Sequence, residues 1–281
     1  MRIILVIIAV LAISFSSPGQ TLKIMSYNIR LDNPGDGRNA WPNRKDRLID
    51  LVKQTAPDVL GVQEALHHQL VDMLKGLDEY SMVGVGRDDG KQKGEYSAIL
   101  FRKDVFELRD QNTFWLSETP RVAGSKSWDA AITRVATWAR LLHKPTQTEI
   151  LAVNTHFDHI GKESRLKSAE LIREKISEIA GDLPVVLTGD FNFTRQDPPY
   201  QALMKTGGLT LIDSAPSDPP GTFCGFEVGA MECKAIDYIF YSPHWALERY
   251  EVIPSNNGRD YPSDHLPVLV DISAILCQLF R

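Results

Sequence analysis

Residues 184–192 read PVVLTGDFN, and this stretch shows the pattern on which the fold assignment depends. Pro184 to Leu187 is a short apolar run with the length of a buried strand, and it leads directly into Gly189-Asp190-Phe191-Asn192. Polar side chains are costly inside an apolar strand unless they are paired, whereas at a strand end they can point into a shared cleft. The stretch therefore predicts a buried strand that ends with Asp190 and Asn192 in a cleft.

The same pattern recurs where other predicted strands end. A single asparagine or aspartate at a strand end is more often a turn former or a helix cap than a catalyst. Turns alone do not explain so many polar residues with the same placement, and we expect their side chains to meet in one site. These residues are Asn28, Glu64, His156, Asp158, Asp190, Asn192, Asp237, Asp264 and His265.

Helices and strands alternate along the chain. Residues 163–180 form the clearest predicted helix, because Leu166, Ala169 and Ile172 recur at helical spacing and Gly181 can end the helix. The pattern indicates an α/β protein with mixed sheets rather than purely parallel ones, since some strands are sequence neighbours. The other predicted helices cover residues 43–55 and 66–75, the predicted strands include 22–30, 58–63, 97–102, 105–108, 137–142, 149–157, 184–187, 235–241 and 266–272, and a long loop covers 117–134.

The N-terminus has the layout of a secretory signal peptide. Arg2 precedes an apolar run, Ile3 to Ile13, and a stretch of small and turn-forming residues follows up to Gly19. The run is shorter than the roughly 20 residues that a helix needs to span a bilayer. We therefore expect a signal peptide at residues 1–19, a secreted or periplasmic mature protein, and no stable membrane insertion.

The rest of the chain, residues 20–281, is expected to form a single catalytic domain. Its length would allow two domains, but it contains no Gly/Ser-rich or Pro-rich linker, no charge block and no internal repeat. We expect this domain to act as a monomer.

The composition disfavours long nucleic acids as substrates. The chain has 31 Lys and Arg against 36 Asp and Glu, and its formal net charge is -5. A protein that neutralises many phosphates along a nucleic acid usually has a basic face. The composition offers no obvious basic face, so a small phosphate-ester substrate is the better expectation.

The three cysteines are Cys224, Cys233 and Cys277. In an oxidising compartment the first two could close a small loop and leave Cys277 unpaired. Three reduced, partly buried thiols are the alternative, and the sequence does not decide between the two. The Cys and His spacings do not resemble a zinc site.

The polar strand ends suit metal-assisted attack of water on phosphorus. A hard divalent cation prefers carboxylate and carbonyl oxygens, and Mg²⁺ keeps several waters, so one or two carboxylates can hold it. Glu64 is the natural principal ligand. A base must activate the water, and His and Asn donors must meet the charge that gathers on the phosphoryl oxygens. We therefore expect Mg²⁺ as the cofactor, with Mn²⁺ as a possible substitute.

Six short motifs occur in a fixed order along the chain, and together they resemble the endonuclease/exonuclease/phosphatase superfamily. The resemblance covers essentially the whole expected mature chain and extends, through further short stretches, to a secreted bacterial-type branch of unassigned substrate. It implies a four-layer α/β/β/α sandwich, with two mixed β-sheets packed face to face and helices outside. The motifs are Ser26-Tyr27-Asn28, Gln63-Glu64, Asn154-Thr155-His156, Gly189-Asp190-Phe191-Asn192, Ile236-Asp237-Tyr238 and Ser263-Asp264-His265.

The resemblance also implies roles for individual residues. Glu64 would bind the metal, Asn28 would assist it, and Asp264 would lie in the metal's shell. Asp190 would orient and deprotonate the attacking water. Asn192 would hold a non-bridging phosphate oxygen.

The two histidines of the motifs would act on the phosphate. His265 would contact the scissile phosphate, and Asp237 would fix its tautomer and raise its basicity. Whether His265 acts as a base, an acid or an electrostatic stabiliser stays open. His156 would donate to the phosphate, and Asp158 would orient His156 or the leaving group.

Two further residues are candidate substrate contacts. Arg134 could bind a second anionic group of the substrate, and Trp128 in the long loop could meet a substrate ring or chain. The sequence departs from the apurinic-site endonucleases at Arg30, where those enzymes carry an aspartate, and Asp32 is the candidate replacement. This departure weakens any inference of a DNA-repair role. His159 is expected at the surface or in packing.

Three classes of function remain open. The leading one is a Mg²⁺-dependent phosphodiesterase or phosphomonoesterase that acts on nucleotides, sugar or inositol phosphates, or lipid head groups. A catalytically inactive binding module on the same scaffold is the second, and the presence of Glu64, Asp190, Asp237 and His265 speaks against it. A hydrolase of a glycosidic bond is the third, and it fits poorly with the Asn and His phosphate-binding positions, although the scaffold alone does not exclude it.

Overall fold

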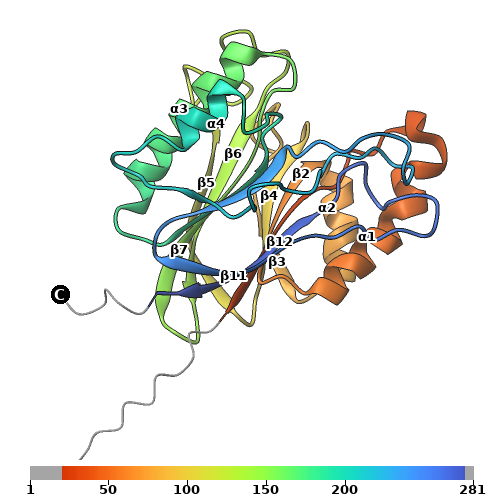
Figure 1. Cartoon of the computed structure of the whole chain (residues 1–281), viewed down its shortest axis with the longest axis horizontal. Helices are drawn as coiled ribbons and strands as arrows, with labels where there is room; N and C mark the ends of the chain where they lie inside the picture. Colours follow the sequence, from red (N-terminus) through yellow and green to blue (C-terminus); the bar gives the residue numbers. More distant parts are fainter. Residues whose placement is uncertain (1–20, 276–281) are drawn as a thin grey trace, which may run out of the picture.

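The computed structural model describes residues 21–275 (Figure 1). The expected signal peptide at residues 1–19 and Cys277 lie outside this range. The described strands form two six-stranded sheets.

The first sheet has the strand order β11-β12-β1-β2-β4-β3, and the second has the order β5-β6-β7-β8-β10-β9. The strands of the first sheet are β1 (Leu22–Asn28), β2 (Val59–Ala65), β3 (Tyr80–Val83), β4 (Tyr96–Arg102), β11 (Trp245–Val252) and β12 (Val268–Ala274). The strands of the second sheet are β5 (Phe106–Trp115), β6 (Val135–His143), β7 (Thr148–His156), β8 (Val185–Asp190), β9 (Ile212–Asp213) and β10 (Asp237–Tyr241).

Both sheets are mixed, as predicted. β1 pairs in parallel with β2, and β7 pairs in parallel with β8, whereas the neighbours β5 and β6 are antiparallel. Parallel neighbours need a long crossover connection, usually a helix. The chain supplies one in each sheet: α1 (Trp41–Thr55) lies between β1 and β2, and α3 (Lys162–Ala180) lies between β7 and β8.

Helices cover the outer face of each sheet, which confirms the four-layer sandwich (Figure 1). Leu48 of α1 packs with residues of α2 (His67–Gly76) in the cluster on the first sheet. Ile172 of α3 packs with Leu203 of α4 (Pro198–Leu203) in the cluster on the second sheet. Within the part of the chain that the structure describes, no helix is long and apolar enough to cross a membrane.

The inner faces of the two sheets meet in a separate apolar cluster. Aliphatic side chains dominate it, and they alternate with the residues that face the helices, as expected for strands with both faces buried. The members include Ile24, Val59 and Ile99 from the first sheet and Ile150, Val186 and Ile239 from the second.

A buried network of hydrogen bonds around Asn154 crosses this interface. Asn154 Oδ1 in β7 accepts from Gln63 Nε2 in β2 at 2.6 Å and from the Thr188 hydroxyl at 3.0 Å. The Asn154 Nδ2 donates at 2.8 Å to two backbone carbonyls of the first sheet. Gly61 gives this network room, because a Cβ there would lie 2.1 Å from Thr188 Oγ1. The Asn154 amide therefore ties the two sheets together.

The strand register brings the polar strand ends to the same edge of each sheet. Asn28 pairs with Gln63 across β1 and β2. His156 pairs with Asp190 across β7 and β8, and Asp190 pairs with Asp237 across β8 and β10. Side chains that lie far apart in the sequence are thus collected where both sheets end.

Candidate active site

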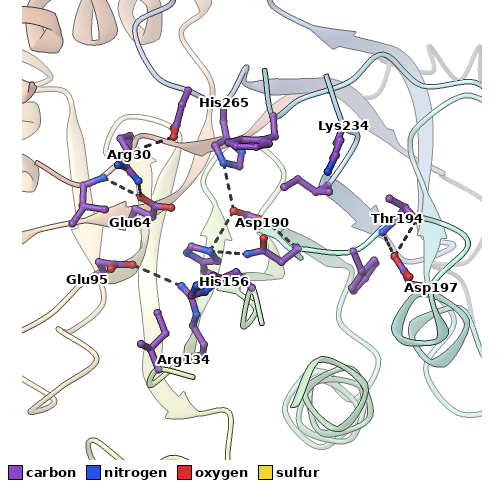
Figure 2. A pocket seen from close by; sticks show the side chains of 18 residues that line it. Arg30, Glu64, Glu95, Arg134, His156, Asp190, Thr194, Asp197, Lys234 and His265 are labelled. Atoms are coloured by element: carbon purple, nitrogen blue, oxygen red, sulfur yellow. Dashed lines mark hydrogen bonds and ion pairs between the residues drawn. The ribbon is translucent and has the colours of Figure 1, made fainter. Parts of the chain in front are cut away.

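A cavity of about 520 Å³ lies at the polar ends of the strands (Figure 2). Asn28 and Asp237 lie behind its wall and hydrogen-bond to residues in it. Its volume is typical of a site for a small ligand. The predicted site residues that line the cavity are Glu64, Arg134, His156, Asp190, Asn192, Asp264 and His265.

Glu64, Asp190 and His265 each bring one potential metal-ligand atom into a group whose members lie within 4.8 Å of one another. Glu64 lies where the pairing of β2 with β4 shifts register, and its φ of 63° is in the left-handed region, which non-glycine residues seldom adopt. The N–H of Leu31 donates to Glu64 Oε2 at 3.1 Å. Backbone strain of this kind is often found at functional sites. Here it falls on the residue that was predicted to bind the metal.

Asn28 orients two carboxylates. Its Oδ1 accepts the N–H of Arg30 at 3.0 Å, and its Nδ2 donates to Glu64 Oε1 at 3.0 Å and to Asp190 Oδ2 at 2.9 Å. The amide oxygen is therefore engaged, and Asn28 acts in the structure as a donor. Its role as a metal ligand stays a prediction.

Asp190 lies at the centre of the site. Its Oδ1 accepts the N–H of Asn192 at 3.0 Å. Its Oδ2 lies 3.3 Å from His156 Nε2 and 3.8 Å from His265 Nε2. Asn192 has a φ of 50°, and its Nδ2 lies 3.1 Å from His156 Nε2. The Asp190 carboxylate is thus surrounded by His156, His265 and the backbone N–H of Asn192 (Figure 2).

Asp237 supports His265 from behind the cavity. Its Oδ2 lies 2.8 Å from His265 Nδ1 and accepts the Thr222 hydroxyl at 2.6 Å. Both members of the pair are buried. Because Nδ1 faces Asp237, Nε2 is the ring nitrogen that faces Asp190.

The site separates the charges of its titratable groups. Burial and the neighbouring Asp237 raise the pKa of Asp190 to about 7. Burial alone would lower the pKa of His265, but the negative charge of Asp237 outweighs it and raises this pKa to about 10. Burial and the positive charge of Arg134 hold the pKa of His156 well below its usual value. Near pH 7, His265 is therefore protonated and His156 is neutral, a division typical of acid and base sites.

The donor set fits a hard divalent cation. Glu64 and Asp190 offer carboxylate oxygens in the group described above, and Asp264 also lines the cavity. Burial raises the pKa of Asp264. Acidic groups held this close repel one another, and a cation between them would relieve the repulsion. Glu64 and Asp190 supply the grouped carboxylates that could hold it, and Asp264 lies on the same cavity wall.

Arg30 brings a positive charge to the acidic wall. Its guanidinium makes two hydrogen bonds of 3.0 Å to Asp36. It also lies 3.9 Å from Glu64 and 3.8 Å from Asp264. The departure at this position therefore replaces an acidic side chain by a paired cation that adjoins two acidic groups of the site.

Three predicted candidates lie away from the cavity wall. Asp32 Oδ2 lies 2.9 Å from His68 Nε2, and Asp32 is not among the described residues that line the cavity. Asp158 accepts four backbone N–H groups at 2.7 to 3.1 Å, which fixes the long loop against the start of α3 and occupies both carboxylate oxygens. Trp128 is partly exposed on the loop and is not among the residues that line the cavity.

His159 lies at the surface, as expected, but it also lines the cavity. It is exposed, and its Nδ1 lies 3.3 Å from Arg134 Nη2. Glu95 also lines this side of the cavity and was not predicted. His159 follows β7 and Glu95 precedes β4, and neither belongs to a motif that would have identified it from the sequence.

A short hairpin supplies the opposite side of the cavity. The Phe223 ring lies 4.9 Å from the His265 ring, and Phe223 and Lys234 exchange two backbone hydrogen bonds of 2.9 Å. A disulfide joins the next pair, Cys224 and Cys233. Phe223 and Lys234 both line the cavity. The cysteine spacing was the one sequence feature that could have pointed to this hairpin.

Residues 25–265 match the model of the Endonuclease/Exonuclease/phosphatase family. The chain belongs to this family. The match runs from β1 to His265 and so includes every strand end of the cavity. Members of the endonuclease/exonuclease/phosphatase family are phosphoesterases or nucleases and generally depend on a divalent metal, which supports hydrolase activity at this site.

Solved members of the family have the same fold. An endonuclease/exonuclease/phosphatase from Bacteroides vulgatus is 41% identical with a TM-score of 0.84, over 91% of this chain and 100% of that one. A mannosyl-6-phosphatase from Bacteroides thetaiotaomicron is 39% identical with a TM-score of 0.82, over 89% of this chain and 99% of that one. Nocturnin from Drosophila melanogaster is 23% identical over 92% of this chain, which spans only 47% of that protein's length.

Proposed function

We propose that this family member is a Mg²⁺-dependent phosphomonoesterase of small phosphorylated molecules, with sugar phosphates as the first candidate substrates. The group formed by Glu64, Asp190 and His265 carries the proposal, because a potential ligand atom from each lies within 4.8 Å of the others, and the three supply a metal ligand, a candidate base and a candidate phosphate donor. The mannosyl-6-phosphatase at 39% identity supports the choice of sugar phosphates. The cavity volume supports a small substrate over a long nucleic acid.

Asp190 is the proposed base. A carboxyl group with a pKa of about 7 can accept a proton from the attacking water at neutral pH. A divalent cation held by Glu64 and Asp264, with Mn²⁺ as a substitute for Mg²⁺, would lower the pKa of water and balance the charge of the phosphoryl group.

The remaining polar residues are proposed to bind the phosphoryl group. Asn192 and His156 adjoin Asp190, and they are proposed to donate to the non-bridging oxygens of the phosphoryl group. His265, held protonated by Asp237, stabilises the negative charge that develops in the transition state. Its fixed orientation means that this donor needs no reorganisation during the reaction.

We also propose that the mature protein is secreted or periplasmic and acts as a monomer. The sequence of residues 1–19 and the Cys224–Cys233 disulfide support an oxidising compartment. Fractionation of cells that produce the tagged full chain tests the location, and the mass of the exported form shows whether the leader was removed. Size-exclusion chromatography tests the oligomeric state.

Phosphate release from mannose 6-phosphate, p-nitrophenyl phosphate and bis(p-nitrophenyl) phosphate tests the activity, in Mg²⁺, in Mn²⁺ and in EDTA. We expect metal-dependent release from the monoesters that Asp190→Ala and His265→Ala both abolish. Asp182→Ala, in the exposed turn after α3, is the matched control and should leave the rate unchanged. Release from the diester alone would favour a phosphodiesterase, and no release from a broad panel would favour the binding module or a non-phosphate bond.

A further inference from the structure

Arg134 is a nearly buried cation on the cavity wall. It directly precedes β6, is 5% exposed, and lines the cavity together with His156 and His159 (Figure 2). Its Nη2 lies 3.3 Å from His159 Nδ1. Its Nε and Nη1 are buried and have no hydrogen-bond partner within residues 21–275. The guanidinium therefore keeps donor capacity that the protein does not use.

Arg134 lacks a close acidic partner of its own. Glu95 Oε2 lies 2.6 Å from Arg87 Nη1 and 3.7 Å from Arg134 Nη1, so one carboxylate faces two guanidinium groups. A guanidinium does not lose its proton in a protein, and a buried charge is normally paired. Arg87 also lies 3.8 Å from Asp88, whereas the one acidic contact of Arg134 within residues 21–275 is the 3.7 Å approach to the shared Glu95. A bound anion would give Arg134 a closer partner.

We propose that Arg134 matches the second negative charge of a phosphomonoester and thereby sets the preference of the site for monoesters over diesters. The inference rests on the proposed function. A phosphate monoester loses its second proton with a pKa near 6 and carries close to two negative charges at about pH 8. A diester carries one. The positive charge of Arg134 therefore attracts the doubly charged monoester more strongly than the singly charged diester.

A purely structural role for Arg134 gives a different expectation. If Arg134 served only to hold Glu95 and the loop before β6, then its loss would lower both ester activities by the same factor. Arg140 of β6 is the matched control, because it pairs with Glu149 at 2.6 Å and is not among the described residues that line this cavity. The ratio of the two activities separates the roles, since a partly unfolded sample lowers both equally.

The test compares p-nitrophenyl phosphate with its methyl diester at about pH 8 and saturating Mg²⁺. Arg134→Gln should lower kcat/KM for the monoester by about 30-fold or more and for the diester by less than about 3-fold. Arg134→Lys should keep most of the preference, and Arg140→Gln should change both activities alike. Arg134→Met replaces Arg134→Gln if that variant does not fold. Equal losses on both esters would overturn the proposal.

Binding of inorganic phosphate, measured by calorimetry on the same proteins, gives a second readout. Arg134→Gln should weaken the binding of phosphate by about 10-fold or more and that of dimethyl phosphate much less. This comparison decides the role of Arg134 even if the wild-type protein hydrolyses neither ester, in which case the proposed function fails by itself. Equal affinity of the wild-type and variant proteins for phosphate would refute the role of Arg134.

Discussion

His265 and Asp237 form a buried pair in which His265 Nδ1 lies 2.8 Å from Asp237 Oδ2. Asp237 begins β10 in the second sheet, whereas His265 precedes β12 in the first, so the pair joins the ends of both sheets. The Thr222 hydroxyl donates to the same Asp237 oxygen at 2.6 Å. The positive charge of His265 is thus what balances the buried carboxylate, and the pair fixes both the orientation and the charge of the histidine.

Asp237→Asn should lower kcat about 100-fold with little change in KM, because the variant removes the charge that keeps His265 protonated and offers an amide N–H to Nδ1. Steady-state kinetics with p-nitrophenyl phosphate measure the effect. In EDTA-treated protein, NMR of the His265 ring should show the protonated form at about pH 8 in the wild type and the neutral form in the variant. Thr222→Val, which removes one donor and no charge, should cost only about 10-fold. An Asp237→Asn protein with wild-type kcat would show that the pair has no part in the reaction.

The disulfide should support both stability and activity. Cys224→Ser combined with Cys233→Ser should lower the free energy of unfolding by about 2 to 3 kcal/mol, the value expected for a loop of this length. Activity should fall as well, because the adjoining Phe223 packs on His265 and its partner Lys234 lines the cavity. Urea unfolding and kcat/KM measure the two effects. A reducing agent should lower the stability and the activity of the wild type and should change neither in the double variant. Equal inactivation of both proteins would show that the reducing agent acts on a group other than this disulfide.

His143 should make the fold less stable in acid. Its ring packs on Phe106, its Nδ1 lies 2.7 Å from the Thr146 hydroxyl, and its buried Nε2 has no partner in the described part of the chain. Burial lowers the pKa of His143 below 6.5. The unfolded chain therefore binds this proton at a higher pH than the folded chain does, so that stability is lost as the pH falls through 6.5.

His143→Gln should flatten that loss. The free energy of unfolding, measured in urea at about pH 7.5 and about pH 5, should fall less in the variant than in the wild type. One titrating group cannot contribute more than about 1.4 kcal/mol per pH unit. Equal slopes for the two proteins would mean that other groups cause the acid sensitivity.

The sequence predicted those parts of the fold and the site that depend on local pattern. The apolar run before Asp190 predicted β8, and the helical spacing up to Gly181 predicted α3. The polar residues at the strand ends predicted the cavity, because parallel neighbours end at a common edge and an antiparallel neighbour begins there. β11 was missed, since it is an edge strand whose middle residues are exposed and charged, which leaves no clear alternation.

The features of the site that the sequence did not predict depend on contacts between residues far apart in the chain. Asp158 follows the Asn154-Thr155-His156 motif closely and was therefore expected to act in the site. Its carboxylate instead accepts from a loop about 27 residues away and from the turn that follows it. Arg134 lacks a close carboxylate partner because the fold places Arg87 at 2.6 Å from Glu95, which Arg134 approaches only to 3.7 Å. Such groupings depend on tertiary structure, and neither periodicity nor spacing contains them.

Removal of the metal should reveal Glu64 without reference to activity. Mg²⁺ at about 100 times its dissociation constant should stabilise the folded wild type by about 2.7 kcal/mol, because the unfolded chain lacks the grouped carboxylates. For a chain of this size the melting temperature should rise by roughly 5 °C or more, and EDTA should reverse the rise. Glu64→Gln should lose most of the shift, since it keeps the shape of the side chain and removes its charge. Glu174→Gln, on the exposed face of α3, is the matched control and should shift like the wild type. A shift of the same size in Glu64→Gln would show that Glu64 does not bind the cation, and it would contradict the metal site on which the proposed function depends.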